Sequence, residues 1–165
     1  MTARAFVFGD DIDTDQLAPG HAMKLAPEAM ARFCLEAIDP TFASRVRPGD
    51  VVVAGVNFGM GSAREQAAMV LVALGVGVVL ARSFARIFYR NAINVGLPAF
   101  VLPGEILITD GDALSIDVET AALYNLTMAT DHPLTPLPPH LIAMIRDGGL
   151  IPHLKRRFAQ RRAEA

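Results

Sequence analysis

The sequence predicts an α/β fold built on a parallel core sheet. Short apolar runs rich in β-branched residues, at 51–54 and 76–81, indicate buried strands. Stretches with helical apolar spacing follow them, at 62–74 and 84–94. Such alternation favours a parallel sheet flanked by helices. The length of 165 residues suits a single domain spanning 1–165.

The first two thirds of the chain supply the alternating elements. Pro27 lies near the start of one predicted helix, and Gly96 closes another. In chain order we expect a strand at 4–8, an acidic loop at 10–15, a helix at 27–38, a strand at 51–54, a helix at 62–74, a strand at 76–81, a helix at 84–94 and a strand at 99–102.

After Pro103 the pattern changes. Residues 113–118 alternate like an exposed antiparallel strand, and 123–129 are expected to pair with them through a turn near Thr120. A proline-rich loop is predicted at 131–139, followed by a helix at 140–146 and a break at Gly148 and Gly149. The chain then ends in a basic helical tail at about 150–165.

Composition excludes several classes of function. With 52% hydrophobic residues and a net charge of −2, the chain is typical of a globular protein and not of a charge-driven nucleic-acid binder. The basic tail contains Phe158 and is predicted to be a solvated helix. Glycines interrupt the longest apolar run, 67–81, so no membrane span is expected. Without a basic and apolar leader, the chain is predicted to be cytoplasmic.

The cysteine and histidine content predicts that this chain holds no metal. Cys34 is the only cysteine, whereas an iron–sulfur cluster normally needs three or four thiolates. The four histidines show no metal-ligand spacing.

The segment NFGMGSAREQAA, 57–68, predicts a glycine-rich turn that leads into a helix. Ser62 is a good N-cap and Glu65 completes a capping-box pattern. Such a turn either only caps its helix or presents backbone N–H groups to an anion. Arg64 is unfavourable in a first helical turn, so we expect it to have an acidic partner or ligand.

Two further segments carry charge that allows more than one interpretation. GDDIDTDQLAPG, 9–20, has four aspartates that could hold a divalent cation, form turns and caps, or belong to a substrate-facing loop with Thr14 or Asp15. Arg86 and Arg90 lie four apart in the helix predicted at 84–94. They could grip a carboxylate or phosphate, but a solvated face is favoured.

Three segments in the same order and spacing resemble the small subunits of 3-isopropylmalate dehydratase. They are GDDIDTDQLAPG, NFGMGSAREQAA and SFARIFYRNAINVGLP, and IRDGGLIPHLKRR near the end is also similar. The resemblance relates the chain to the mobile fourth domain of aconitase. It implies a swivelling β/β/α three-layer domain that closes over a [4Fe–4S] cluster held by a large subunit, whose iron acts as a Lewis acid on the leaving hydroxyl.

The same resemblance implies roles for individual residues. Ser62 matches the serine that takes the substrate proton, and Arg64 matches the arginine that binds a substrate carboxylate. Thr14 and Asp15 match the polar pair of the acidic loop, and Gly61 is expected to bring backbone N–H groups close to the substrate. A helix N-terminus and a guanidinium would stabilise an alkoxide at Ser62.

The chain departs from the family pattern at several positions. Met60, Ala63 and Gln66 replace a cysteine, a serine and a histidine. Ala63 removes a hydroxyl that in relatives can touch a substrate carboxylate. Lys24 lies in the segment that sets substrate choice, where it either pairs with a further carboxylate or is solvated.

The resemblance therefore predicts the small subunit of a two-component hydro-lyase, inactive without its large partner. The expected substrates are 3-isopropylmalate and 2-isopropylmalate in leucine biosynthesis. The same chemistry on homoaconitate, citraconate with 2-methylmalate, or dimethylmalate is an alternative. A non-catalytic module that binds a carboxylate is an alternative of another class, and retention of Ser62 argues against it. Assembly as a heterodimer or heterotetramer is expected.

Overall fold

The computed structural model describes residues 2–104 and 107–163, which form a seven-stranded mixed sheet in the order β4-β3-β2-β1-β5-β6-β7. Strands β1 to β4 pair in parallel, and β5 joins the opposite edge of β1 in antiparallel fashion. The strand bounds are β1 Ala3–Val7, β2 Val51–Ala54, β3 Val78–Ala81, β4 Ala99–Val101, β5 Ala113–Asp117, β6 Ala122–Asn125 and β7 Thr130–Pro133.

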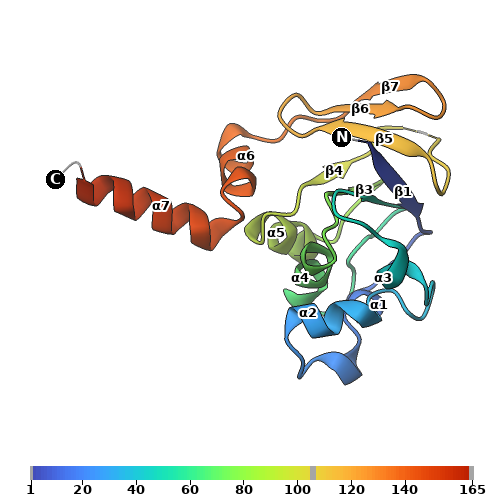
Figure 1. Cartoon of the computed structure of the whole chain (residues 1–165), viewed down its shortest axis with the longest axis horizontal. Coiled ribbons are helices and arrows are strands. Elements are labelled where there is room, and N and C mark those ends of the chain that lie inside the picture. Colours follow the sequence, from blue (N-terminus) through green and yellow to red (C-terminus); the bar gives the residue numbers. More distant parts are fainter. Residues whose placement is uncertain (1, 105–106, 164–165) are drawn as a thin grey trace.

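Helices α1 to α5 lie together on one side of the parallel strands, and α7 extends away from the body of the molecule (Figure 1). Their bounds are α1 Thr14–Leu17, α2 Pro27–Met30, α3 Phe42–Arg45, α4 Gln66–Ala73, α5 Arg86–Asn94, α6 Pro139–Arg146 and α7 Leu150–Ala163, with short 3₁₀ turns η1 Gly20–Ala22 and η2 Ala31–Phe33. None of the described helices combines the length and apolarity that crossing a membrane requires.

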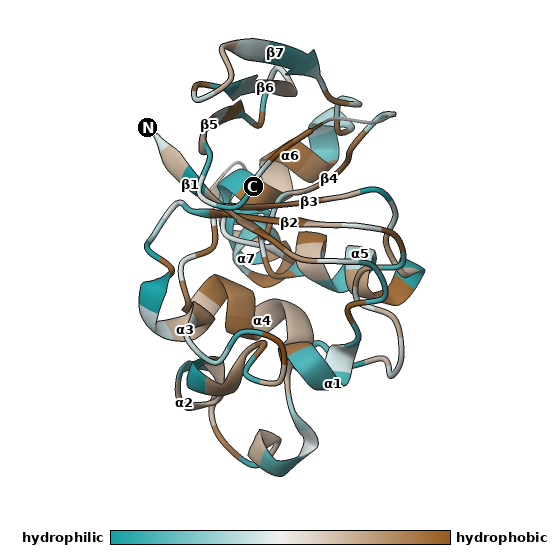
Figure 2. Cartoon of the chain, turned by 90° about the vertical axis from the view of Figure 1, so that its right-hand side faces the viewer, coloured by the Kyte–Doolittle hydropathy of each residue, from teal (hydrophilic) through white to brown (hydrophobic). Residues whose placement is uncertain are grey.

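The parallel strands are buried on both faces because two apolar clusters cover them. Val52 and Val79 point toward the helices, whereas Val53 and Leu80 point the other way, where Leu114 of β5 packs. Successive side chains alternate between faces, so one short apolar run serves both clusters. Figure 2 shows the resulting pattern, with apolar β2 and β3 in the middle and polar β7 at the outer edge. The three-layer β/β/α fold class is confirmed.

The strand predictions hold for the parallel sheet and for the hairpin of β5 and β6. The loop predicted at 131–139 is wrong at its start, because Thr130–Pro133 forms β7 and pairs with β6. Pro133 is tolerated there because β7 is an edge strand and the proline ends it.

Two helix predictions are corrected. The helix expected at 27–38 stops early: α2 passes into a 3₁₀ turn, and Leu35 takes a positive φ of 60° while its N–H bonds the Gln16 carbonyl at 2.8 Å. The helix expected from Ser62 begins at Gln66, and its N-cap, Glu65, makes no side-chain capping bond. The capping box at Ser62 is therefore absent. In α5, the apolar Ile87 is exposed.

Candidate functional site

Three loops meet where neighbouring parallel strands end. An isolated β-bridge joins Asp13, in the loop after β1, to Met60, in the loop after β2. A second one joins Phe58, also in the loop after β2, to Phe84, in the segment after β3. The Gly59 N–H donates to the Ile12 carbonyl at 2.7 Å. Ligands of α/β proteins bind outside the carboxyl ends of parallel strands, so this is the position in the fold where a site is expected.

Three of the four aspartates in the acidic loop hold this junction together. Asp10 accepts the Val56 N–H at 2.8 Å, and Asp11 accepts the Asn57 side-chain amide at 2.8 Å. Asp13 caps α1 in a capping box with Gln16. The cap interpretation is thus confirmed for Asp13, whereas Asp10 and Asp11 bind the loop after β2 and do not form local turns or caps. Among the described residues no group of three or more His, Cys, Asp or Glu is arranged to hold a metal.

Thr14 and Ser62 are brought together from separate loops. Thr14 is buried at the start of α1, and its N–H donates to the Met60 carbonyl at 2.8 Å. Its Oγ1 accepts the Ser62 N–H at 3.1 Å and lies 3.4 Å from Ser62 Oγ. A hydroxyl can accept two hydrogen bonds and donate one, so either the Thr14 or the Ser62 O–H can be the donor in this contact. Ser62 itself is exposed.

Two glycines permit this approach. Gly61 has a φ of +100°, and an added Cβ would lie 3.1 Å from Thr14 Oγ1. Gly59 has a φ of +79°, and an added Cβ would lie 2.1 Å from Phe88 Cγ of α5. A side chain at either position meets both backbone strain and its neighbour.

Arg64 has the acidic partner that its sequence position predicts. Its Nη1 pairs with Asp15 Oδ1 and also donates to the Ala18 carbonyl at 3.1 Å. Both contacts tie the β2 loop to α1. Since each uses Nη1, the Nε and Nη2 hydrogens remain for a ligand as far as the described part of the chain is concerned.

The other predicted site residues are exposed. Ala63 follows Ser62 on the surface, and Lys24 lies in the turn after η1 without an ion pair to any described residue. Neither Ser62 nor Ala63 belongs to α4, so the helix-terminus stabilisation expected for a Ser62 alkoxide is lost. The Thr14 hydroxyl is the side-chain group that lies beside Ser62 Oγ instead.

Asn57 and Ser83 are positions that the sequence interpretation missed. Asn57 adopts a φ of +60°, and its N–H donates to Ser83 Oγ at 2.8 Å. Asparagine tolerates this left-handed conformation better than most residues, which is the one signal in the sequence. Arg86 and Arg90 are both exposed, as expected of a solvated face.

Cys34 is remote from this chemistry. It is buried among apolar side chains, and burial raises the pKa of its thiol above its usual range. A thiol that stays protonated is neither a nucleophile nor a metal ligand.

Comparison with known proteins settles the family. A family model described as the aconitase C-terminal domain matches residues 22–104. The 3-isopropylmalate dehydratase small subunit of Moorella thermoacetica is 46% identical over 159 residues, which cover 95% of this chain and 96% of that protein. This chain belongs to that family of hydro-lyase small subunits. A small subunit implies a large subunit as its partner.

Further relatives support the family but differ in the activity that their names give. The small subunit 1 of 3-isopropylmalate dehydratase from Thermotoga maritima is 45% identical, covering 94% of this chain and 95% of that protein. The methanogen homoaconitase small subunit of Methanothermobacter thermautotrophicus is 44% identical, covering 93% and 89%. A crystal structure of 3-isopropylmalate dehydratase from Methanocaldococcus jannaschii superposes with a TM-score of 0.93 at 38% identity, covering 99% and 98%.

Proposed function

We propose that this chain provides the proton-transfer side of the active site of 3-isopropylmalate dehydratase in leucine biosynthesis, with Ser62 as the base. The observation that carries the proposal is the junction of Thr14 and Ser62 at the carboxyl ends of β1 and β2. In the reaction, one C–H proton passes to Ser62 Oγ and hydroxide leaves the neighbouring carbon. Hydration of the double bond then adds the hydroxyl to the carbon that lost the proton and the proton to the carbon that lost the hydroxyl.

Thr14 supports Ser62 in this role. A serine hydroxyl is a weak base in water, so its deprotonated form needs donors held in place before the reaction. The Thr14 O–H is such a donor, because the Ser62 and Met60 backbone contacts orient it. Thr14 is therefore proposed as a positioning and stabilising residue.

Substrate carboxylates are proposed to bind beside Ser62. The Gly61 and Ala63 backbone N–H groups make no hydrogen bond within the described residues, and both lie on the exposed loop. Arg64 adds N–H groups from a side chain that Asp15 already holds. Together they offer donors to a carboxylate whose carbon chain reaches Ser62.

The cluster is proposed to belong to the large subunit. The residues of this chain do not fit a [4Fe–4S] group, because Cys34 is its one thiol and is buried. The exposure of Met60, Ser62 and Ala63 leaves the site open toward a partner. We therefore propose that the site is completed at the subunit interface, in a heterodimer or heterotetramer, and that this chain alone is inactive.

Homoaconitate is the second candidate substrate, because the homoaconitase relative is nearly as similar as the dehydratase relatives. A longer acid with a third carboxylate would need an additional cation. Lys24 is the candidate, since its exposed ammonium lies in the turn that follows α1 and η1. Citraconate, 2-methylmalate and dimethylmalate lack that carboxylate and do not require Lys24.

The test is an activity assay of the complete enzyme. The chain is co-expressed with a large subunit encoded nearby, the cluster is reconstituted anaerobically, and unsaturated-acid formation is followed by ultraviolet absorbance on a panel of malate derivatives. Turnover of isopropylmalate supports the proposal, and turnover of homoaconitate that falls in Lys24→Ala assigns the second substrate. If no acid reacts with an intact, cluster-loaded complex, the carboxylate-binding module becomes the better account.

A further inference from the structure

Helix α7 is fixed in place and yet buries none of its side chains. Its fourteen residues include no buried position, and Figure 1 shows it extending away from the sheet and the other helices. Isolated helices of this length are marginal in water, because helical stability in proteins comes mainly from packing of an apolar face. A covering surface outside the described chain would supply that packing.

The direction of α7 is set at its first turns. The Asp147 carboxylate, at the end of α6, contacts His153 Nδ1 at 2.7 Å and accepts from Arg156 Nη1 at 2.6 Å. Gly149 packs so tightly that an added Cβ would lie 2.4 Å from the Asn94 carbonyl oxygen. These contacts hold α7 outward, so its apolar side chains do not fold back onto the same chain.

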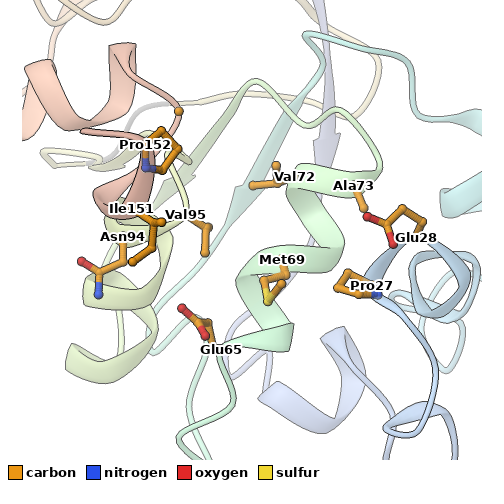
Figure 3. Close-up of a pocket in the computed structure, with 11 residues that line it drawn as sticks. Pro27, Glu28, Glu65, Met69, Val72, Ala73, Asn94, Val95, Ile151 and Pro152 are labelled. Carbon is orange, nitrogen blue, oxygen red and sulfur yellow. The ribbon is translucent and has the colours of Figure 1, made fainter. Parts of the chain in front are cut away.

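Three apolar side chains form a stripe along α7. Ile151, Leu154 and Phe158 are spaced three and four apart, which places them on one helical face. Ile151 is 61% exposed and Phe158 is 59% exposed. The stripe runs into a cavity of about 430 Å³ between α4 and the start of α7, where Met69, Val72 and Ile151 line the wall (Figure 3). Val72 is also exposed, so stripe and cavity form one apolar surface.

The distribution of charge in this chain indicates which molecule covers the apolar surface of α7 and the cavity. Helix α7 carries five basic residues and no acidic one, whereas the rest of the chain has ten basic against seventeen acidic residues, a net charge of −7. Glu28 and Glu65 border the cavity on opposite sides of Met69, and neither forms an ion pair within the described residues (Figure 3). A second copy of this chain therefore offers both the apolar wall and the negative charge that α7 lacks.

We propose that α7 is the dimerisation element of this chain. The stripe of Ile151, Leu154 and Phe158 packs against the cavity beside α4 in a second copy, and the second α7 packs back in the same way. The basic side chains of each α7 face the acidic surface of the other copy. A surface used by both partners in this way gives a closed two-fold dimer. The assembly with the large subunit is then a heterotetramer.

The test uses sedimentation velocity on the full chain, alone and in complex with the large subunit. Phe158→Glu removes the largest apolar side chain of the stripe and should weaken dimerisation at least tenfold. Gln160→Glu is the matched control, because it makes the same change in charge on the opposite side of the helix. Wild type and Gln160→Glu should sediment as dimers alone and as heterotetramers in complex, and Phe158→Glu as monomers and heterodimers.

A second variant keeps the outcome clear if Phe158→Glu fails to fold, which circular dichroism would show. Lys155→Glu combined with Arg157→Glu preserves the stripe but lowers the charge of α7 from +5 to +1, and should also weaken the dimer at least tenfold. A monomeric wild type, or a dimer that none of these changes weakens, overturns the proposal. The proposal is also overturned if the wild-type chain alone is a monomer and the Phe158→Glu variant no longer binds the large subunit. In that case α7 would bind the large subunit.

Discussion

Two regions differ in how many of their side chains find partners within the described chain: the junction of the loops after β1 and β2, and helix α7. At the junction, Asp10, Asp11 and Asp13 each accept hydrogen bonds from the chain, and Arg64 is held by Asp15. The outer surface around Ser62 is left open. On α7 the polar contacts stop after the second turn, and an apolar stripe stays exposed. The difference fits the two proposals made above: a site that is completed by substrate and a partner, and a helix that packs on a second copy.

The largest expected effect is on folding at the junction. Gly59→Ala places a Cβ 2.1 Å from Phe88 Cγ at a φ of +79°, so overpacking and backbone strain act together. We expect the free energy of unfolding to fall by about 3 kcal/mol. Urea denaturation measures it, with Gly9→Ala as the control because a Cβ there meets nothing within 4 Å. An unchanged midpoint would show that the junction is looser than its contacts indicate.

The next effect is on turnover. Thr14→Val keeps the shape of the buried side chain but removes the hydroxyl that contacts Ser62. We expect kcat to fall about 100-fold in the reconstituted complex, in the range for loss of a stabilising donor, with KM nearly unchanged. Thr14→Ser should restore most of the rate. Equal losses in Thr14→Ser and Thr14→Val would instead indicate a packing role.

A smaller effect is expected on substrate binding. Arg64→Lys keeps the charge but loses the planar fork of donors that can bind Asp15 and a substrate carboxylate at once. KM should rise about tenfold, with a smaller change in kcat. Steady-state kinetics separate the two constants, and Arg90→Lys on the exposed face of α5 is the control. If kcat falls and KM does not change, Arg64 acts on the reaction step.

The smallest effect concerns the base of α7. The His153 contact and, after it, the Arg156 contact lower the pKa of Asp147 below its ordinary value. A carboxyl whose pKa is depressed in the folded state stabilises above its unfolded pKa, about 3.9, and loses that stabilisation as pH falls through the folded pKa. Amide exchange in α7 should therefore accelerate between about pH 4 and pH 3. Asp147→Asn should remove that pH dependence, and a wild type with pH-independent exchange in this window would show that Asp147 does not hold the helix.

The sequence predicts the sheet better than the loops. Val51–Ala54 is buried on both faces, and such a strand appears in the sequence as a continuous apolar run. The start of α4 was mispredicted because Ser62 and Glu65 satisfy a local capping pattern. In the fold, the Met60 contacts with Asp13 and Thr14 hold the loop instead. Those contacts join positions far apart in sequence, which no local pattern reveals.

In the candidate site, too, the sequence predicts some residues but not the contacts between them. The sequence predicts an acidic partner or ligand for Arg64, because an arginine near a helix start is unfavourable there. It does not predict that this partner is Asp15. The Thr14 and Ser62 pairing depends on neighbouring strands ending at one edge of the sheet. The family resemblance named both residues without giving their contact. The tail was expected to be a solvated helix, and the exposure of its apolar stripe becomes evident only in the structure, where α7 buries none of its side chains.

The central claim is that Ser62 transfers the substrate proton, and the most direct test is exchange of that proton in the cluster-loaded complex. Wild type and Ser62→Ala are incubated in deuterium oxide with 3-isopropylmalate, and deuterium incorporation is followed together with turnover. Ser44→Ala is the control for loss of a surface hydroxyl. We predict that Ser62→Ala lowers both rates by about 10³ or more while the complex and its cluster stay intact. Wild-type exchange in Ser62→Ala would contradict the account.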